Sequence, residues 1–401
     1  MKAGWKYRKL GEVCEIMGGG TPAKNNELFY RDGVIPWATV RDMKSEVISE
    51  TEFKITKEAV RSSSTNIIPK DNLVIATRVG LGKVCLLKYD TAINQDLKGI
   101  IPRSTSELIV GYLFQWFKNT AHIIQDEGTG ATVQGVKLPF IKSIIIPIPP
   151  MKEQQRIVTI LDEAFDGIAT AKVNAEKNLQ NARALFESHL QSVFTQRGEG
   201  WVEKPLEKVA LIINGFAFKS TDFSPRGIVK SIKITNVGVR EFICKSDCYL
   251  PEGFDTKYVA ASVQKGSIVI ALTRTIISGG LKVAVVPDEY NGALLNQRVA
   301  AITDRPDTMT VPFLFAYLST QTVVDYVKKR VNTLMQPNLS INDLRSMPIP
   351  LPTVQEQNMI ANKLDALRTE TQRLESIYQQ KLAALDALKK SILDQAFTGQ
   401  L

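Results

Sequence analysis

The sequence has few of the residues from which catalytic centres are usually built. Of its 401 residues, only two are histidines. His122 lies in an aromatic run and His189 in a long segment of helical pattern, so we expect neither a histidine-based triad nor a zinc site. The four cysteines do not recur at matching places in the two halves of the chain, which favours reduced thiols.

Long apolar runs are missing as well. No run reaches the ~18 residues that a membrane span needs, and the start of the chain, MKAGWKYRKL, lacks the apolar core of a signal peptide. We therefore expect a soluble, cytoplasmic protein without a membrane partner.

The common motifs of nucleotide-binding and nucleic-acid-modifying enzymes do not occur. The nearest approach to a phosphate-binding loop, GLGKV at residues 80–84, lacks the spacing and the hydroxyl of that motif. There is no GxGxxG and no Asn-Pro-Pro-aromatic sequence, and EFK at residues 52–54 has no upstream Pro-Asp partner that would make it a nuclease motif. We expect a protein that is not an enzyme and holds no metal. A nuclease or methyltransferase acting by itself is the alternative that these absences disfavour.

One unusual phrase occurs twice, as IPIPPMKEQQRI at residues 146–157 and as IPLPTVQEQNMI at residues 349–360. Proline fixes φ and removes a backbone donor, so each phrase begins as an extended segment. A helix start follows, because Thr353 and Glu356 have the spacing of a capping box and Glu153 suits a helix N-terminus. A repeated junction implies a repeated unit.

The repeat extends upstream of each junction. KDNLVIATR (70–78) is echoed by KGSIVIALTR (265–274), INQDL (93–97) by LNQRV (295–299), and YLFQWF (112–117) by FLFAYL (313–318). The β-branched runs predict strands and the aromatic runs predict one helix in each block. We predict an α+β fold with pseudo-twofold order: similar globular α/β domains at 1–150 and 199–352, and long helical segments at 151–198 and 353–401.

Two proline-free segments, residues 153–195 and 356–397, carry apolar residues at steps of three and four. As helices they would be roughly 60 Å long, and each stripe is narrow enough to suit another helix. We predict an antiparallel coiled coil. Two separate surface helices are the alternative, but a globular block at one end would leave most of each stripe uncovered. The predicted seam consists of Leu161, Ile168, Leu179, Phe186, Leu364, Leu367, Leu374, Leu382 and Leu385.

The net charge of +9 is concentrated in two blocks. Residues 1–150 contain 20 Lys and Arg against 15 Asp and Glu, and residues 201–350 contain 18 against 13, so each block has a net charge of +5. A basic excess in two places is typical of a protein that contacts a polyanion twice. Ordinary solubility charge would explain either block alone, and the duplication favours nucleic acid.

Matching loops in the two blocks supply candidate contacts to nucleic acid. Each loop, near residues 78–83 and 274–282, contains an arginine, flexible glycines and a lysine. The arginine could bond to a guanine edge with both of its terminal nitrogens, and the lysine could contact phosphate. The Asn-Gln repeats offer amides suited to adenine, and polar runs at 128–137 and 332–340 precede both junctions. Solvated turns and bonds to backbone are the alternatives for any single residue. The candidates are Arg78, Lys83, Gln95, Gln134 and Lys137 in the first block, and Arg274, Lys282, Gln297, Arg298, Gln336 and Asn338 in the second.

The duplicated junction, the segment GGTPAKNNELFYRDGVIPWATVRDM (19–43) and the repeated Asn-Gln resemble the specificity subunit of a Type I restriction-modification system over nearly the whole chain. The resemblance implies two target-recognition domains separated by conserved helical spacers. It implies a non-catalytic subunit that reads a bipartite site in double-stranded DNA, one half-site per domain, with the spacer fixing the gap.

The same resemblance implies partners. Two modification subunits would dock on the spacer and methylate adenine at N6 with S-adenosylmethionine, and restriction subunits would use ATP and Mg²⁺ to cleave DNA. This subunit itself would then need no cofactor.

The two blocks diverge where IPWATVRDM in the first block is replaced by SIKITNVG in the second. We therefore expect an asymmetric target, with Thr39 and Arg41 as further candidates in the first block and Lys233 and Asn236 in the second. An adaptor that joins proteins through its coiled coil without touching DNA would explain the helices but not the paired basic blocks.

Overall fold

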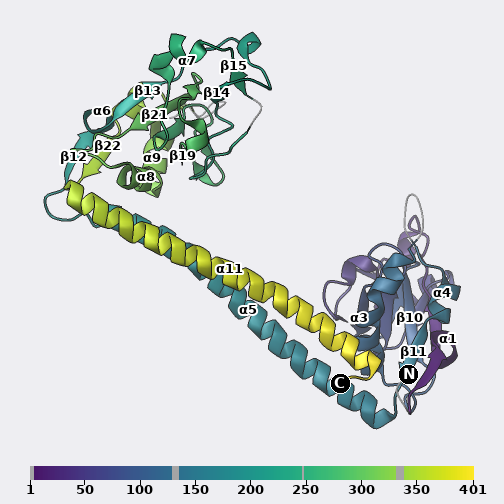
Figure 1. Ribbon diagram of the computed structural model, residues 1–401. Helices are drawn as coiled ribbons and strands as arrows, with labels where there is room; N and C mark the ends of the chain where they lie inside the picture. Colours follow the sequence, from purple (N-terminus) through teal and green to yellow (C-terminus); the bar gives the residue numbers. More distant parts are fainter. Residues whose placement is uncertain (1–3, 129–134, 246–247, 331–337) are drawn as a thin grey trace. The chain divides into compact units, whose positions relative to one another are not determined.

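The computed structural model describes residues 4–128, 135–245, 248–330 and 338–401. They form two compact units: unit 1 comprises residues 1–176 and 380–401, and unit 2 comprises residues 177–379 (Figure 1). Two long helices, α5 (Met151–Thr195) and α11 (Val354–Thr398), each contribute one part to each unit. The units thus divide the chain within the long helices rather than at the predicted domain ends. No helix among the described residues is long and apolar enough to cross a membrane.

Unit 1 is built on two sheets. The first has the strand order β2-β10-β7-β8-β4, and the second has the order β5-β3-β9-β6. Their strands are β2 (Cys14–Gly18), β3 (Ile35–Ala38), β4 (Val47–Ile48), β5 (Phe53–Ile55), β6 (Asn66–Ile68), β7 (Leu73–Ala76), β8 (Val84–Leu87), β9 (Thr91–Ile93) and β10 (Leu97–Pro102). The short helices and the helices packed on these sheets are α1 (Leu10–Val13), η1 (Glu27–Phe29), η2 (Val40–Asp42), α2 (Lys57–Arg61), α3 (Val110–Asp126) and α4 (Leu138–Ser143).

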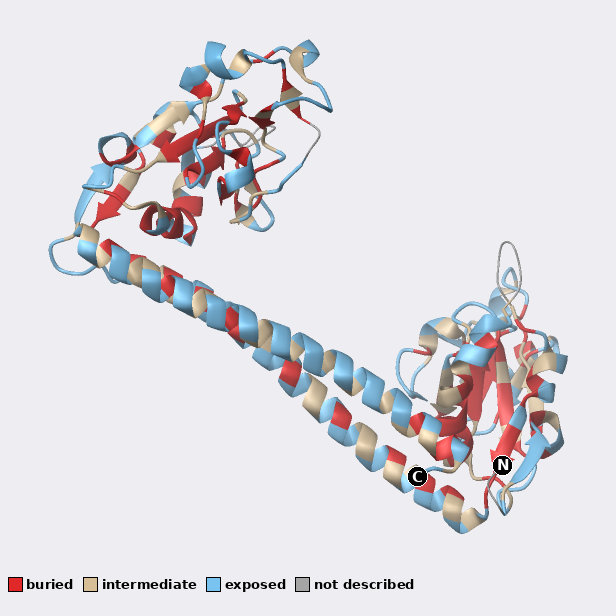
Figure 2. Ribbon diagram, viewed as in Figure 1, coloured by how far each residue is buried: buried red, intermediate tan, exposed pale blue. Residues whose placement is uncertain are grey.

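The core of unit 1 lies between its first sheet and α3, and the buried residues of both are drawn red in Figure 2. Tyr112, Trp116 and Phe117 of α3 are at most 2% exposed and belong to the same cluster as Leu73 and Ile75 of β7. The predicted aromatic helix and the predicted strand at 73–76 are confirmed.

Unit 2 repeats this plan with shorter elements. Its main sheet has the order β13-β21-β16-β19, and a second sheet has the order β15-β14-β20. The strands are β13 (Leu211–Asn214), β14 (Val229–Ile232), β15 (Tyr249–Leu250), β16 (Ile268–Ala271), β17 (Ile276–Ile277), β18 (Gly280–Leu281), β19 (Val283–Val285), β20 (Leu294–Leu295) and β21 (Val299–Thr303). The helices are α6 (Leu206–Val209), η3 (Ser220–Asp222), α7 (Phe254–Lys257), η4 (Val259–Ala261), η5 (Asp288–Tyr290), α8 (Val311–Leu318), α9 (Gln321–Arg330) and α10 (Ile341–Arg345). Both units mix helices and sheets, which confirms the α+β prediction.

The repeated phrase is an edge strand followed by a helix in both units. β11 (Ile145–Ile148) pairs with β1 (Lys6–Lys9), and β22 (Pro348–Leu351) pairs with β12 (Val202–Pro205). Each pair is a two-stranded sheet, so the prolines occupy positions at a sheet edge where a missing donor is tolerated. The helix begins within three residues of each strand end.

The glutamine of each phrase explains why the phrase recurs. Gln154 is fully buried: its Nε2 donates to the carbonyls of Glu107 (2.7 Å) and Pro149 (2.9 Å), and its Oε1 accepts from the N–H of Ile109 (3.0 Å). A single side chain thus satisfies three backbone groups and joins the start of α5 to the start of α3.

Gln357 makes the same three bonds in unit 2. It is also fully buried and bonds to Thr308 O (2.9 Å), Pro352 O (3.1 Å) and Thr310 N (2.9 Å). The predicted capping box is only half formed: Thr353 Oγ1 accepts from Glu356 N (3.3 Å), but Glu356 Oε1 accepts from Trp201 Nε1 (2.8 Å).

The long helices lie side by side and antiparallel within each unit (Figure 1). In unit 1, Arg156 donates to Leu401 O and Lys172 pairs with Asp386. In unit 2, Arg183 pairs with Glu375 (2.9 Å), and the Arg368 guanidinium lies 5.3 Å from the Phe186 ring centroid. All nine predicted seam residues are buried or half-buried, so the antiparallel pairing is confirmed within each unit. Thr371, the polar residue in the stripe, is 3% exposed and its hydroxyl bonds to its own helix at Leu367 O (2.9 Å).

Candidate functional site

The candidate site of each unit forms where three segments converge beyond the main sheet. In unit 1, Thr77 N donates to Asp96 O (2.9 Å), and Thr77 O accepts from Val136 N (2.8 Å). In unit 2, Leu272 N donates to Arg298 O (2.9 Å), and Leu272 O accepts from Leu339 N (2.9 Å). The hairpin loop, the Asn-Gln turn and the segment before the junction therefore meet in both units, as the sequence repeat predicts.

The Asn-Gln turns are held by close backbone contacts that require glycine. A Cβ on Gly19 would lie 2.0 Å from Asn94 O, and a Cβ on Gly215 would lie 2.0 Å from Asn296 O. No side chain fits at either position. The adjacent bonds also match, from Gly20 N to Ile93 O (3.0 Å) and from Phe216 N to Leu295 O (2.8 Å). These contacts fix the backbone from which the Gln95 and Gln297 side chains extend.

A fourth segment follows the parallel strand of the second sheet. Asn94 N bonds to Ala38 O (3.0 Å), and Asn296 N bonds to Ile232 O (3.0 Å). The positions after these strands, Thr39 and Lys233, are therefore equivalent. The divergent stretches IPWATVRDM and SIKITNVG thus occupy the same place in the two units.

In unit 1, several predicted residues gather around one pocket of about 660 Å³. Thr39, Arg41 and Gln95 line it, and all are half-buried or exposed. Thr39 caps η2 through its contacts with Arg41 N and Asp42. Gln95 Oε1 accepts from the hydroxyl of Thr21.

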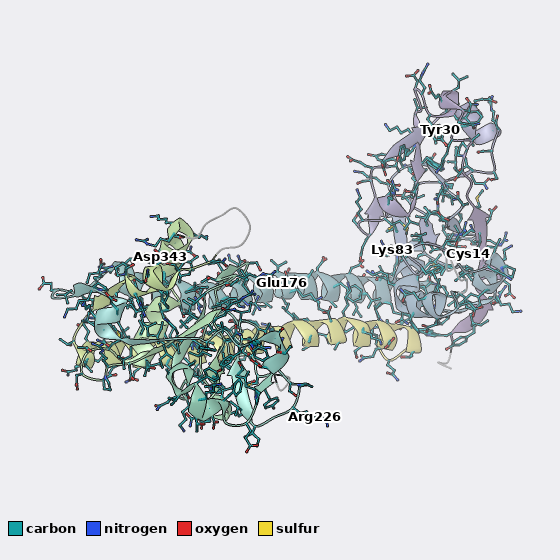
Figure 3. All side chains as sticks on the ribbon, turned by 90° about the horizontal axis from the view of Figure 1, so that it is seen from above. Cys14, Tyr30, Lys83, Glu176, Arg226 and Asp343 are labelled. Atoms are coloured by element: carbon teal, nitrogen blue, oxygen red, sulfur yellow. The ribbon has the colours of Figure 1, made fainter. Side chains whose placement is uncertain are left out.

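The remaining predicted residues of unit 1 lie beside this pocket. Arg78 is exposed and lies 3.5 Å from the Asp96 carboxylate. Lys83 and Lys137 are exposed, and Lys137 precedes α4. Gln134 lies outside the described residues. In Figure 3, Tyr30 lies in the part of unit 1 far from α5, and Lys83 lies nearer to that helix.

Sequence reasoning missed the apolar lining of this pocket. Tyr30, Trp37, Phe53 and Val79 contribute to it, together with Lys24. The aromatic residue inside the polar stretch IPWATVRDM was the available signal, because a tryptophan next to candidate polar contacts is typical of a binding site.

In unit 2, two of the predicted residues serve the fold of their own loop. Asn236 is 1% exposed, and its amide is used by Lys233 N (2.9 Å) and by Ile243 O (3.0 Å). It occupies the place of Asp42, whose carboxylate accepts from Thr39 N (2.7 Å). Asn236 therefore serves its own loop in this structure, and a contact between Asn236 and DNA stays a prediction.

Lys282 is the second such residue. It is half-buried and its Nζ donates to Ile234 O. Burial and the neighbouring Arg274 lower the pKa of Lys282. As a contact to phosphate, Lys282 is therefore poorly placed, since its ammonium already bonds to backbone.

The other predicted residues of unit 2 remain accessible. Arg274, Gln297, Arg298 and Asn338 are exposed, while Lys233 is half-buried with its Nζ 3.5 Å from the Phe223 ring centroid. Asn338 is bridged to Thr273 beside Arg274. Gln336 lies outside the described residues.

The electrostatics of the two Asn-Gln turns are opposite. Asp96 in unit 1 holds Arg78 and lies beside Lys98, whose pKa is lowered mainly by burial. Its topological counterpart in unit 2 is Arg298, and within the described residues neither Arg274 nor Arg298 has an ion-pair partner. Unit 2 thus presents two unneutralised guanidinium groups where unit 1 presents a neutralised one.

Among the described residues, no group of three His, Cys, Asp or Glu side chains could hold a metal ion. Cys14, Cys85, Cys244 and Cys248 are free thiols, and burial raises the pKa of Cys14 to about 12. The exposed polar and charged side chains at these sites are suited to binding through hydrogen bonds and charge.

Comparison with known proteins agrees with this geometry. The chain is 27% identical to the Type I restriction enzyme MjaVIII specificity subunit of Methanocaldococcus jannaschii, covering 99% of this chain and 93% of the relative. It is 36% identical to the EcoR124I/EcoR124II specificity subunit of Escherichia coli, over 41% of this chain and 42% of that relative.

Two solved structures share the fold. The HsdS subunit from Thermoanaerobacter tengcongensis superposes with a TM-score of 0.69 at 20% identity, over 100% of this chain and 98% of that one. A chain from a type I restriction-modification system studied for complex assembly and conformational transition gives a TM-score of 0.75 at 18% identity, over 100% of this chain and 99% of that one. The family described as Type I restriction modification DNA specificity domain matches residues 2–180 and 198–383, so the chain belongs to that family of specificity subunits, which recognise DNA sequences.

Proposed function

We propose that this subunit reads a bipartite, asymmetric site in double-stranded DNA, with unit 1 contacting one half-site and unit 2 the other. The observation that supports this most is the convergence, in both units, of the same four segments, which carry different side chains. Two dissimilar half-sites require two units that share a backbone arrangement but present different side chains to the DNA.

We further propose that α5 and α11 set the gap between the half-sites and dock two modification subunits. A helix rises 1.5 Å per residue, so its length is set by the number of its residues. A flexible loop has no such fixed end-to-end distance. Restriction subunits would complete the assembly. S-adenosylmethionine, ATP and Mg²⁺ would be used by those partners, this subunit would be non-catalytic, and the complex would act in the cytoplasm.

The gap proposal is tested by lengthening both helices. Insertion of one heptad into the middle of α5 and one into the facing part of α11 adds roughly 10 Å of helix, which corresponds to about 3 base pairs of B-form DNA. Selection of binding sites from a random duplex library should return the same two half-sequences with a gap about 3 base pairs longer. An unchanged gap would refute the spacer role.

Binding itself is tested with the full chain and duplex DNA at a series of salt concentrations. DNA binding predicts that the logarithm of affinity falls linearly with the logarithm of salt concentration. A protein adaptor that does not touch DNA would show no specific duplex binding in either assay, which would reject the proposal.

A further inference from the structure

Unit 1 has a pocket that can enclose a small group, whereas contacts to the groove edges and phosphates of a duplex need no pocket. At about 660 Å³ it is within the ~300–1,000 Å³ typical of sites that enclose a small organic group. Five aromatic or aliphatic side chains and several polar ones line it, and they include residues of the segments that converge at the candidate site. The pocket therefore has room for one nucleotide unit at the proposed reading face.

The aromatic side chains present apolar surface to the pocket because their polar atoms are already bonded. Tyr30 Oη donates to Pro22 O (2.8 Å), and Trp37 Nε1 donates to Gly20 O (3.2 Å). Trp37 packs edge to face against both neighbours, with ring centroids 6.2 Å from Tyr30 and 6.4 Å from Phe53. Phe53 is 43% exposed and Val79 is 58% exposed. Such rings are held in place and offer surfaces on which a base can stack.

The polar lining of the pocket includes the donors Lys24, Arg41 and Gln95 together with one carboxylate, Asp96. Gln95 accepts from Thr21 through Oε1, and its Nε2 has no hydrogen-bond partner among the described residues. The Arg41 side chain is 78% exposed and lies 3.7 Å from Glu52, and Lys24 adds a further exposed positive charge. Gln95 and Arg41, donors beside apolar rings, suit the acceptor edge of a nucleobase, and Lys24 suits its phosphate.

We propose that this pocket holds one nucleobase of the half-site read by unit 1, turned out of the duplex and stacked against Phe53 and Tyr30. The inference rests on the proposed DNA-binding function. Unstacking and unpairing cost free energy, and stacking in the pocket with hydrogen bonds from Gln95 and Arg41 offsets that cost. The pocket would therefore select among bases, because only a base whose edge matches these donors regains the free energy lost on unstacking and unpairing.

Unit 2 provides an internal comparison. Phe216 occupies the place of Gly20, and its ring packs against Phe218 (5.2 Å between centroids) and Tyr258 (4.5 Å). These rings of unit 2 contact one another, and Phe216 is 44% exposed. We assign the extruded base to the half-site of unit 1, because the pocket described above belongs to unit 1.

The test is a double-mutant cycle that combines a substitution in the pocket with the removal of one base and measures the affinity of the protein for DNA. Duplexes carrying the selected site are made with an abasic nucleotide at each position of both half-sites in turn, and their affinities for the full chain are measured with wild-type protein and Phe53→Ala. On the intact site, Phe53→Ala should weaken binding about 5- to 100-fold, the range of base–aromatic stacking. At one position in the half-site of unit 1, removal of the base should abolish this difference between the proteins.

Matched variants make the result decisive. Tyr89→Ala removes another ring of unit 1 that is 51% exposed and lies outside the pocket, and it should leave every affinity unchanged. Val79→Ala provides a second probe of the pocket, should Phe53→Ala unfold in a thermal melt. If Phe53→Ala weakened binding equally on the intact site and on every abasic duplex, the proposal of an extruded base would be wrong. The proposal that the protein reads DNA would remain. Absence of any specific duplex binding by wild-type protein would overturn both.

Discussion

At their junctions with the long helices, units 1 and 2 use the same residue types, a buried glutamine and a tyrosine, to bond backbone groups. Besides the two glutamines, Tyr112 Oη donates to Pro147 O (2.7 Å) and Tyr317 Oη to Pro348 O (2.9 Å), although the two tyrosines stand at different positions of the repeat. Burial raises the pKa of both phenols, so both hydroxyls remain donors. In both units these side chains satisfy backbone groups at the junction, so removing one of them leaves such groups without a partner.

At their candidate reading faces, the two units share positions but not side chains. Thr39 corresponds to Lys233, and Asp96 corresponds to Arg298. An exposed lysine, Lys83, corresponds to the half-buried Lys282, because Ala76 N bonds to Lys83 O (2.9 Å) as Ala271 N bonds to Lys282 O (3.1 Å). The comparison separates residues that hold a unit together from residues that are able to meet a ligand.

The largest expected effect comes from breaking the junction. Replacing Gln154 with Leu leaves Ile109 N–H and the carbonyls of Glu107 and Pro149 buried without a partner, at ~1–3 kcal/mol for each such group. We expect Gln154→Leu to lower the free energy of unfolding by about 3–5 kcal/mol, measured by urea denaturation. Gln357→Leu should cost a similar amount, because the bonds are the same.

The exposed neighbours Gln155 and Gln355 provide the control. Gln155→Leu and Gln355→Leu make the same chemical change on the same helices outside the hydrogen-bond network, and we expect changes within about 0.5 kcal/mol. A cost for Gln154→Leu no larger than that of Gln155→Leu would show that the buried amide does not stabilise the junction.

The sequence was informative where side chains repeat a periodic or duplicated pattern. The long helices, the aromatic α3 and α8 and the junction strands follow from apolar spacing and from proline chemistry, which are local. The role of Gln154 and Gln357 did not follow, since an amide within KEQQ looks like a solvated helix residue until the carbonyls of a distant segment are placed around it. Predicted domain ends at 150 and 352 mark the junctions, whereas the compact units include parts of both helices.

The next largest effect concerns the charge of the Asn-Gln turn. Asp96→Arg gives unit 1 the residue type that unit 2 has there and removes the carboxylate that holds Arg78. We expect a change of about 10- to 100-fold in base preference at one position of the half-site read by unit 1, the range for one good bidentate contact. The half-site read by unit 2 should remain the same. Binding-site selection on the full chain measures both.

A charge-matched variant separates base reading from general attraction. Glu50→Arg makes the same change of charge on an exposed residue of unit 1 that does not belong to the turn. It should raise affinity for all sequences alike, more at low salt. If Asp96→Arg also raised affinity uniformly, with no change in preferred bases, the turn would not be a base-reading element.

The candidate site was predicted in position but not in detail. Equivalent loops could be found because their sequences repeat, and the structure brings them together. Whether a polar side chain in such a loop faces solvent depends on packing that sequence spacing does not report: Asn236 and Lys282 bond to backbone, while Arg274 and Arg298 remain exposed. Asp96 went unnoticed because its importance lies in its contrast with Arg298 at the same place.

The smallest expected effect tests the two corresponding lysines. Lys83→Ala should reduce DNA affinity several-fold and lower the salt slope by about 1, as loss of one phosphate contact does. Lys282→Ala should leave the salt slope unchanged and instead lower stability by about 1 kcal/mol, because Ile234 O loses its donor.

The lowered pKa of Lys282 means that the folded state binds this proton less tightly than the unfolded state. Wild-type stability relative to Lys282→Ala should therefore rise as pH approaches the ordinary lysine pKa from below. Equal salt slopes for the two variants would show that burial does not distinguish these lysines.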